Sequence, residues 1–250
     1  MPSPADATPA YLYLPELPPV GEECALDSED AHYVTRVCRA GAGQALSATD
    51  GRGTLARLTL LSVRGEVRAR VEARGVAQDP GASGVACGAP EGQRADWMFE
   101  KLAELGVRIV QPLDGGRDRW ERFASRIERW QRLSIAALRQ SRQPWLLEIR
   151  SPLSVGDWLE RLPAGTRRWL ADPEGGPARG LGEGIPGWGA VGPSAGFAAG
   201  ERESLRDAGF RPVRLALGRL RTETAAVAWA ALWAAGSSPE PEISRESTTP

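Results

Sequence analysis

The loop "VGPSAGF" (Val191–Phe197) stands between a short apolar segment and a polar run. It contains two glycines, a proline and otherwise mostly small side chains, and it follows what resembles a strand, Trp188–Val191. Small residues let backbone amides and carbonyls approach a ligand closely. In open parallel sheets, ligands lie beyond the carboxyl ends of the strands. The loop is therefore interpreted as one wall of a ligand site in an α/β domain.

The sequence around this loop alternates between strand and helix patterns, which predicts an α/β domain with a mainly parallel sheet. The helix expected over 95–106 places Met98, Leu102 and Leu105 on one face, with Gly106 as the residue that ends it. A long basic helix carries Phe123, Ile127, Trp130 and Ala137 on one stripe. Strands are expected at 85–90, 107–112, 145–149, 167–172, 187–193 and 211–217, and further helices at 155–162, 201–209 and 224–235.

The chain before residue 78 has a different character. A strand at 10–16, a short helix beginning near Ser28 and alternating β segments over 44–73 predict a small β-barrel. Ser28 is the expected helix cap, with Ala31, Val34 and Cys38 at helical spacing. The predicted organisation is a flexible N-terminus (1–10), a β-barrel domain (11–77), an α/β domain (78–236) and a disordered tail (237–250).

Two other strand exits accompany the first loop. These are "WLADPEGG" (169–176) and "LALGRLRTETA" (215–225). Three such turns at one edge of a sheet could hold a nucleoside-like group by its hydrogen bonds to backbone, with Leu215, Leu217 and Leu220 over its flat face. A Gly- and Pro-containing loop is also the common form of an ordinary turn, so the spacing alone leaves both readings open.

The composition excludes some classes of function. The formal net charge is −1 and the chain has three cysteines and one histidine, without paired Cys spacing, so no metal site is expected. No apolar run has the length of a membrane span and the N-terminus lacks a signal-peptide pattern, which predicts a cytoplasmic protein without a membrane partner. Nine arginines against four acidic residues in 117–150 form a basic stretch that suits either phosphate contact or a solvated helix face.

The ordered motifs resemble one family. "EKLAELGVRIVQP", "RWQRLSIAALRQS", "GPSAGF" and "LRTETA" occur in the order found in the RsmE family of SPOUT-class RNA methyltransferases, and "HYVTRVCRAGAGQALSATDGRG" is similar to that family's first domain. The resemblance covers the chain from Tyr11 to Ala235. It implies a PUA-like β-barrel and a SPOUT domain with a trefoil knot. It also implies S-adenosylmethionine as the cofactor, N3 of a uridine in small-subunit (16S) ribosomal RNA as the acceptor, and a homodimer.

The same resemblance implies the site residues. Arg221 would stabilise the uracil anion or contact phosphate, unless it only pairs with Glu223. Glu223 is a candidate base or a helix-start hydrogen-bonding group. The residues expected to bind RNA are Arg36, Arg117, Gln140, Ser141 and Arg142. The residues expected to bind the cofactor are Leu170, Ala171, Asp172, Val191, Gly192, Pro193, Ala195, Gly196, Leu215, Ala216, Leu220, Thr222, Thr224 and Ala225.

Several positions depart from the family pattern. The Glu-Gly of its G-P-E-G-G-F motif is Ser194-Ala195, Ala216 replaces a glycine, Gly218 replaces an arginine, and Arg219 is displaced by one position. Its S-E-R-S loop reads 115–118, "GGRD", where only the arginine remains. These departures leave open a different RNA or small-molecule acceptor, or a non-catalytic RNA-binding protein.

The last helix is apolar nearly all round. Ala226, Val227, Trp229, Ala230, Leu232 and Trp233 are the residues that give it this character. Such a helix is expected to be buried, in a knot core, in a dimer interface, or in the core of a monomer.

Overall fold

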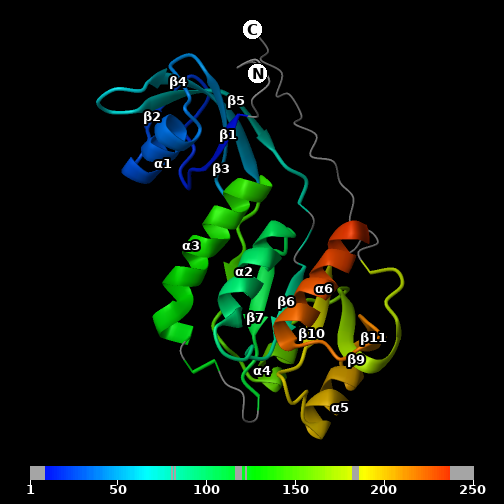
Figure 1. The fold of residues 1–250 in the computed structure, drawn as a ribbon. Coiled ribbons are helices and arrows are strands. Elements are labelled where there is room, and N and C mark those ends of the chain that lie inside the picture. Colours follow the sequence, from blue (N-terminus) through cyan, green and yellow to red (C-terminus); the bar gives the residue numbers. More distant parts are fainter. Residues whose placement is uncertain are drawn as a thin grey trace. The chain divides into compact units, whose positions relative to one another are not determined.

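The computed structural model divides the chain into two compact units. The first contains Met1–Asp79 and Leu138–Trp145, and the second contains Pro80–Ala137 and Leu146–Pro239. Figure 1 shows the course of the chain through both. The sequence gives no sign that Leu138–Trp145 joins the first unit. The structure describes residues 9–79, 81, 83–115, 120–121, 123–181 and 186–236.

The first unit is a mixed five-stranded sheet with a short helical segment. Its sheet order is β1-β3-β4-β5-β2, with β1 parallel to β3 and the other pairs antiparallel. Leu12, Leu46, Leu58 and Leu60 are fully buried in its core. Its elements are β1 (Ala10–Tyr13), β2 (Glu23–Ala25), α1 (Ser28–His32), a π-helical turn η1 (Tyr33–Val37), β3 (Ala45–Thr49), β4 (Thr54–Ser62) and β5 (Arg68–Val76).

Two local expectations for the first unit were wrong. The cap of α1 is Asp27, whose side chain accepts a hydrogen bond from the Asp30 amide at 2.7 Å, and Ser28 is already helical. Ser28 does not cap the helix, because the carboxylate of Asp27, one residue earlier, accepts the hydrogen bond from the amide at the helix start. Cys38 is exposed, since the helix ends in a π-helical turn that rotates it away from the core side on which Val34 lies.

The second unit is a six-stranded parallel sheet with helices on both faces. The strand order is β11-β9-β10-β6-β7-β8. Its elements are β6 (Gly84–Cys87), α2 (Arg94–Glu104), β7 (Ile109–Pro112), α3 (Phe123–Ser141), β8 (Glu148–Ile149), α4 (Val155–Glu160), β9 (Arg167–Pro177), β10 (Gly187–Val191), α5 (Ala199–Asp207), β11 (Arg211–Arg214) and α6 (Thr222–Gly236). The last turn of α3 is part of the first unit.

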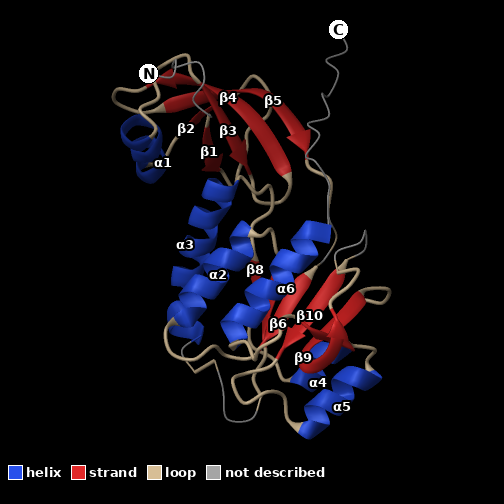
Figure 2. Cartoon of the chain, turned by 45° about the vertical axis from the view of Figure 1, so that its right-hand side comes forward, coloured by secondary structure: helices blue, strands red, loops and turns tan. Residues whose placement is uncertain are grey.

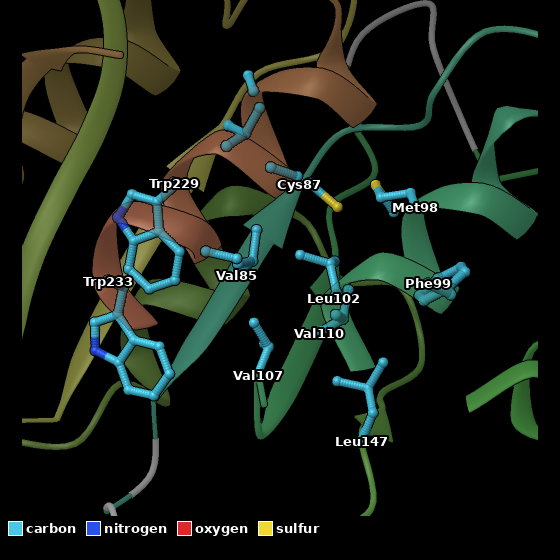
Figure 3. Close-up of a cluster of buried hydrophobic side chains, with 14 of the residues drawn as sticks. Val85, Cys87, Met98, Phe99, Leu102, Val107, Val110, Leu147, Trp229 and Trp233 are labelled. Carbon is cyan, nitrogen blue, oxygen red and sulfur yellow. The ribbon is translucent and has the colours of Figure 1, made fainter. Parts of the chain in front are cut away.

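Alternating residues of the strands supply the two cores. Val85 and Cys87 of β6 belong to the cluster that includes α2, α3 and α6, while Ala86 between them belongs to the cluster with α4 and α5. Figure 2 shows these helices on the two sides of the strands, and Figure 3 shows the first cluster with Trp229 and Trp233 of α6. Gly106 ends α2 with φ +74, as the sequence predicts.

Helix α6 is buried on one face only. Ala226, Trp229, Ala230 and Trp233 are buried, but Leu232 is 39% exposed. Trp229 packs directly on β10, because a Cβ on Gly189 would lie 2.5 Å from its ring. Within one chain α6 is therefore only partly buried and an apolar stripe of it faces outward, and burial of that stripe in a dimer interface stays a prediction. Within the described residues, none of the helices combines the length and apolar character that crossing a membrane requires.

Candidate functional site

A cavity of about 420 Å³ lies in the second unit at the carboxyl ends of β10 and β11 and beside the middle of β9, where the register between β9 and β11 shifts. The lining comes from three segments, 170–174, 191–197 and residues within 214–225, together with Arg202 of α5. The three segments belong to the three predicted loops. Because β9 lies between β10 and β11 in one parallel sheet, their carboxyl ends open at the same edge.

The first segment contributes a buried carboxylate. Asp172 is 9% exposed and its Oδ1 accepts a hydrogen bond from the amide of Glu174 at 3.0 Å. Its Oδ2 lies 3.9 Å from Nη2 of Arg206 on α5. These contacts orient the carboxylate and leave it with spare acceptor capacity toward the cavity.

The second segment is the loop "VGPSAGF", whose glycines are required by its turn. Gly196 has φ +80 and its amide donates to the Pro193 carbonyl at 2.8 Å. A Cβ on Gly192 would lie 3.0 Å from the Phe197 amide nitrogen. The loop therefore folds tightly back on itself and presents its backbone to the cavity, as the sequence predicts.

The third segment is tied to the second by two hydrogen bonds. The Thr222 hydroxyl donates to the Gly192 carbonyl at 3.0 Å, and Nη2 of Arg219 donates to the Ser194 carbonyl at 2.7 Å. Arg219 is the arginine displaced by one position in the sequence motif. Its side chain holds the two walls together and lines the cavity.

The predicted cofactor residues come together almost completely. All of them line the cavity except Thr224, which is exposed on α6. Leu215 and Leu220 line it as expected, but Leu217 is 99% exposed and lies outside it. Residues that line the cavity and that sequence reasoning did not assign to the cofactor are Pro173, Glu174, Ser194, Phe197, Arg202, Arg214, Gly218 and Arg219.

The two catalytic candidates lie outside the cavity lining. The Glu223 side chain is 6% exposed and pairs with Arg94 of α2, Oε1 to Nη1, at 2.9 Å. The pair joins the starts of α2 and α6. Arg221 is exposed and makes no ion pair or side-chain hydrogen bond within the described part of the chain. It is therefore free to contact a ligand, and the alternative of a pair with Glu223 is wrong.

The predicted RNA-binding residues that the structure describes belong to the first unit and differ in exposure. Arg36 and Gln140 are exposed, and Ser141 is half-buried. Arg142 donates to the Pro9 carbonyl and its guanidinium lies 5.7 Å from the centre of the Tyr11 ring, within the first unit. This arrangement gives Arg142 a structural role. Arg117 lies outside the described residues.

Two other kinds of group could carry chemistry: the cysteine Cys87 and the side chains of the types that bind metal ions. Burial raises the pKa of the Cys87 thiol to about 12, so it stays protonated and unreactive. Among the described residues, His, Cys, Asp and Glu side chains form no group of three that could hold a metal ion. The polar groups that can bind a ligand in the cavity are therefore backbone amides and carbonyls, the carboxylates of Asp172 and Glu174, and guanidinium groups.

Comparison with known proteins decides what kind of domain surrounds this cavity. The model of an RNA methyltransferase domain matches residues 78–234, and that of an RNA methyltransferase PUA domain matches residues 26–72. The chain belongs to the RNA methyltransferase domain family. The first match covers the whole parallel sheet with its cavity, and the second covers most of the mixed sheet.

Relatives of this RNA methyltransferase domain protein agree with the RsmE resemblance. A ribosomal RNA small subunit methyltransferase E of Aquifex aeolicus is 32% identical over 137 residues, which cover 53% of this chain and 58% of that protein. A second, from Buchnera aphidicola, is 29% identical over 141 residues, with 54% of this chain and 56% of that protein covered. The chain thus matches little more than half the length of these curated relatives. The predicted family is confirmed.

A solved structure shows the same fold. The ribosomal RNA small subunit methyltransferase E of Neisseria gonorrhoeae, solved bound to S-adenosyl methionine, superposes with a TM-score of 0.79 at 24% identity, over 90% of this chain and 96% of that chain. The predicted fold class, a PUA-like sheet followed by a parallel-sheet SPOUT domain, is confirmed. The passage of the chain through a trefoil knot stays a prediction of the resemblance.

Proposed function

We propose that this protein is an S-adenosylmethionine-dependent RNA methyltransferase whose acceptor is N3 of a uridine in small-subunit ribosomal RNA. One observation carries the proposal: the middle of β9 and the segments that follow β10 and β11 in an RNA methyltransferase domain enclose a cavity of about 420 Å³. The curated relatives, named as small-subunit rRNA methyltransferases, support the choice of acceptor.

The cavity fits the cofactor in size and in chemistry. Leu170, Leu215, Leu220 and Ala225 supply apolar surface that suits an adenine ring. The glycine-rich turn at 192–196 supplies backbone donors and acceptors at short range. The buried Asp172 carboxylate suits ribose hydroxyls or an ammonium group. In this proposal those residues hold the cofactor.

The chain's own residues must then position the acceptor base and handle its proton. A bound cofactor would supply an electrophilic methyl group on a sulfonium, and the chain would have to hold the uracil N3 in line with the methyl–sulfur bond that breaks. The uracil must release its N3 proton to solvent before or during methyl transfer, and a guanidinium stabilises the anion that results. The cations that line the cavity, and could stabilise this anion, are Arg202, Arg214 and Arg219. The exposed Arg221 is free to hold RNA phosphate.

We also propose that the protein works as a homodimer through α6. The outward stripe of this helix consists of Thr224, Ala231, Leu232 and Ala235, with Val227 and Ala228 half-buried. It is apolar and built mainly of small side chains, so a second copy of the same helix can approach it closely. Light scattering after gel filtration should give twice the chain mass. Leu232→Glu should yield monomers, and Leu217→Glu, on another exposed leucine, should not. A wild-type monomer at high concentration would refute the dimer.

Cofactor and acceptor are tested separately. Calorimetry with S-adenosylmethionine should show one site per chain, and absence of binding would refute the methyltransferase proposal. Incubation with small ribosomal subunits from a strain lacking the gene should then produce 3-methyluridine by nucleoside mass spectrometry. Cofactor binding without that product would refute the acceptor and favour another RNA or a small molecule.

A further inference from the structure

A second cavity, also of about 420 Å³, lies in the second unit outside the loops described above. It is bounded by the segment 89–93 after β6, the first turn of α2 and the start of α3. The proposed cofactor site shares none of its lining residues. It therefore needs an explanation of its own.

Three aromatic rings form the floor of this second cavity. Trp120 and Trp130 are buried and Phe123 is half-buried. Their centroids lie 5.6–6.5 Å apart: Trp120 meets Phe123 and Trp130 edge-on, and Phe123 is tilted against Trp130. The indole nitrogens are already used, since Nε1 of Trp120 donates to the Cys87 carbonyl and Nε1 of Trp130 to Asp96. A ligand therefore meets ring carbon, on rings that are held in place before it arrives.

The charged groups at the rim of the second cavity differ in whether they are already paired with other side chains. Asp96 accepts from Trp130 and from Nε of Arg129 at 2.7 Å, so its charge is largely compensated. Arg126, half-buried at the rim, makes no ion pair or side-chain hydrogen bond with any described residue. Glu121, exposed at the same rim, likewise makes no ion pair with any described residue, so the Arg126 guanidinium complements a flat, negatively charged group on the side of the aromatic floor away from Glu121.

The two cavities are close neighbours in the fold. The Gly88 amide donates to the Val191 carbonyl at 3.0 Å, and a Cβ on Gly88 would lie 2.5 Å from the Pro193 nitrogen. Pro193 lines the cofactor cavity, whereas Ala89, the residue after Gly88, lines the second one. The turn at 88–89, directly after β6, thus contacts the wall of the cofactor cavity and lines the second one.

We propose that the second cavity binds a nucleotide of the RNA that flanks the methylated one, with its base against Phe123 and its phosphate on Arg126. This inference rests on the proposed function, because it takes RNA as the substrate. Aromatic faces accept any base, so the subsite adds affinity and directs the strand over the sheet edge without reading its sequence. A target base can then reach the cofactor cavity while its neighbour is held beside it.

The test uses a fluorescein-labelled single-stranded RNA heptamer that contains uridines, and follows its binding to the full chain by fluorescence anisotropy. Arg126→Ala and Phe123→Ala should each weaken binding at least about fivefold, the lower end for loss of one base–aromatic stack. Arg132→Ala is the matched control, since Arg132 is exposed on the same helix and lines neither cavity. It should change binding less than twofold.

Two further readouts keep the outcomes distinct. Photo-crosslinking of the same heptamer with 5-iodouridine should mark the peptide that contains Trp120, Phe123 or Trp130. Calorimetry with S-adenosylmethionine should give wild-type affinity for both variants, which also shows that they are folded. RNA affinity equal to that of Arg132→Ala, or crosslinks elsewhere, would overturn the subsite. Failure of the wild-type protein to bind the cofactor would overturn the proposed function and leave the RNA result standing.

Discussion

The ion pair between Arg94 and Glu223 decides whether Glu223 is a base or a structural group. Its distance is 2.9 Å, and the two side chains are unequally covered, with 44% of Arg94 and 6% of Glu223 exposed. Replacing one partner of a fully buried pair costs about 3–5 kcal/mol. An exposed pair contributes about 0–1 kcal/mol. The Arg94–Glu223 pair is exposed on the arginine side only, so the cost of removing one partner should lie between these two values.

Arg94→Ala should therefore lower the free energy of unfolding by about 1–2 kcal/mol, because it leaves the Glu223 carboxylate buried without its partner. For a unit of this size that corresponds to a melting temperature lower by about 3–6 °C. The double variant Arg94→Ala/Glu223→Gln should recover part of this loss, because the uncompensated charge is gone. Thermal unfolding followed by circular dichroism compares the wild type, Arg94→Ala and the double variant. Arg132→Ala, an exposed site, should stay within about 0.5 kcal/mol of wild type.

The rate of methyl transfer by the Glu223→Gln variant distinguishes a catalytic base from a structural group at this position. If the residue only joins α2 to α6, the variant should keep its rate within a few-fold of wild type. A general base contributes about 10²–10⁴-fold. A loss of that size, with unchanged cofactor affinity and melting temperature, would refute the structural interpretation. It would require Glu223 to leave its partner and reach the acceptor.

Three other predictions test packing, the cofactor loop and pH dependence. Gly189→Val should lower stability by about 1–3 kcal/mol in urea unfolding, because its Cβ would lie 2.5 Å from the Trp229 ring. Thr222→Val removes the hydrogen bond to the Gly192 carbonyl, worth about 1 kcal/mol, and should weaken S-adenosylmethionine binding several-fold by calorimetry without changing the fold. Burial raises the pKa of Asp30 from 3.8 to about 6, against the opposing effect of a nearby arginine. Its protonated form therefore favours folding below pH 4, and that contribution is lost as the pH rises to 6. Wild-type stability should show this fall and Asp30→Asn should not, when urea unfolding is compared from pH 4 to 7; identical profiles would contradict it.

The sequence was most informative where a pattern is local. Strand and helix alternation, the glycine that ends α2 and the small residues of the turn at 192–196 all follow from spacing and backbone conformation, and each lies where it was expected. The short edge strand Glu23–Ala25 was missed, because three residues carry no usable periodicity.

The errors at the site and in the domain bounds arise because contact partners come from distant parts of the chain. Glu223 pairs with a residue 129 positions away, and Leu138–Trp145 joins a unit that consists mainly of Met1–Asp79. Arg202 and Arg214 line the cavity from α5 and β11, with no motif to mark them. Sheet order alone brings these positions together, and a single sequence does not state the order.

The departures from the family pattern affect the cavity less than their number suggests. Ser194 stands where the family has glutamate, yet its part in the cavity wall is a carbonyl that accepts from Arg219, and every residue has that carbonyl. Ala216 adds one methyl group to a wall that remains open. A site built from backbone tolerates changes of side chain, whereas a surface that meets RNA through arginine side chains does not. Divergence in this chain should therefore have altered which RNA it accepts more than its hold on the cofactor, and relatives with the same Ser194 should bind S-adenosylmethionine with similar affinity while differing in their acceptors.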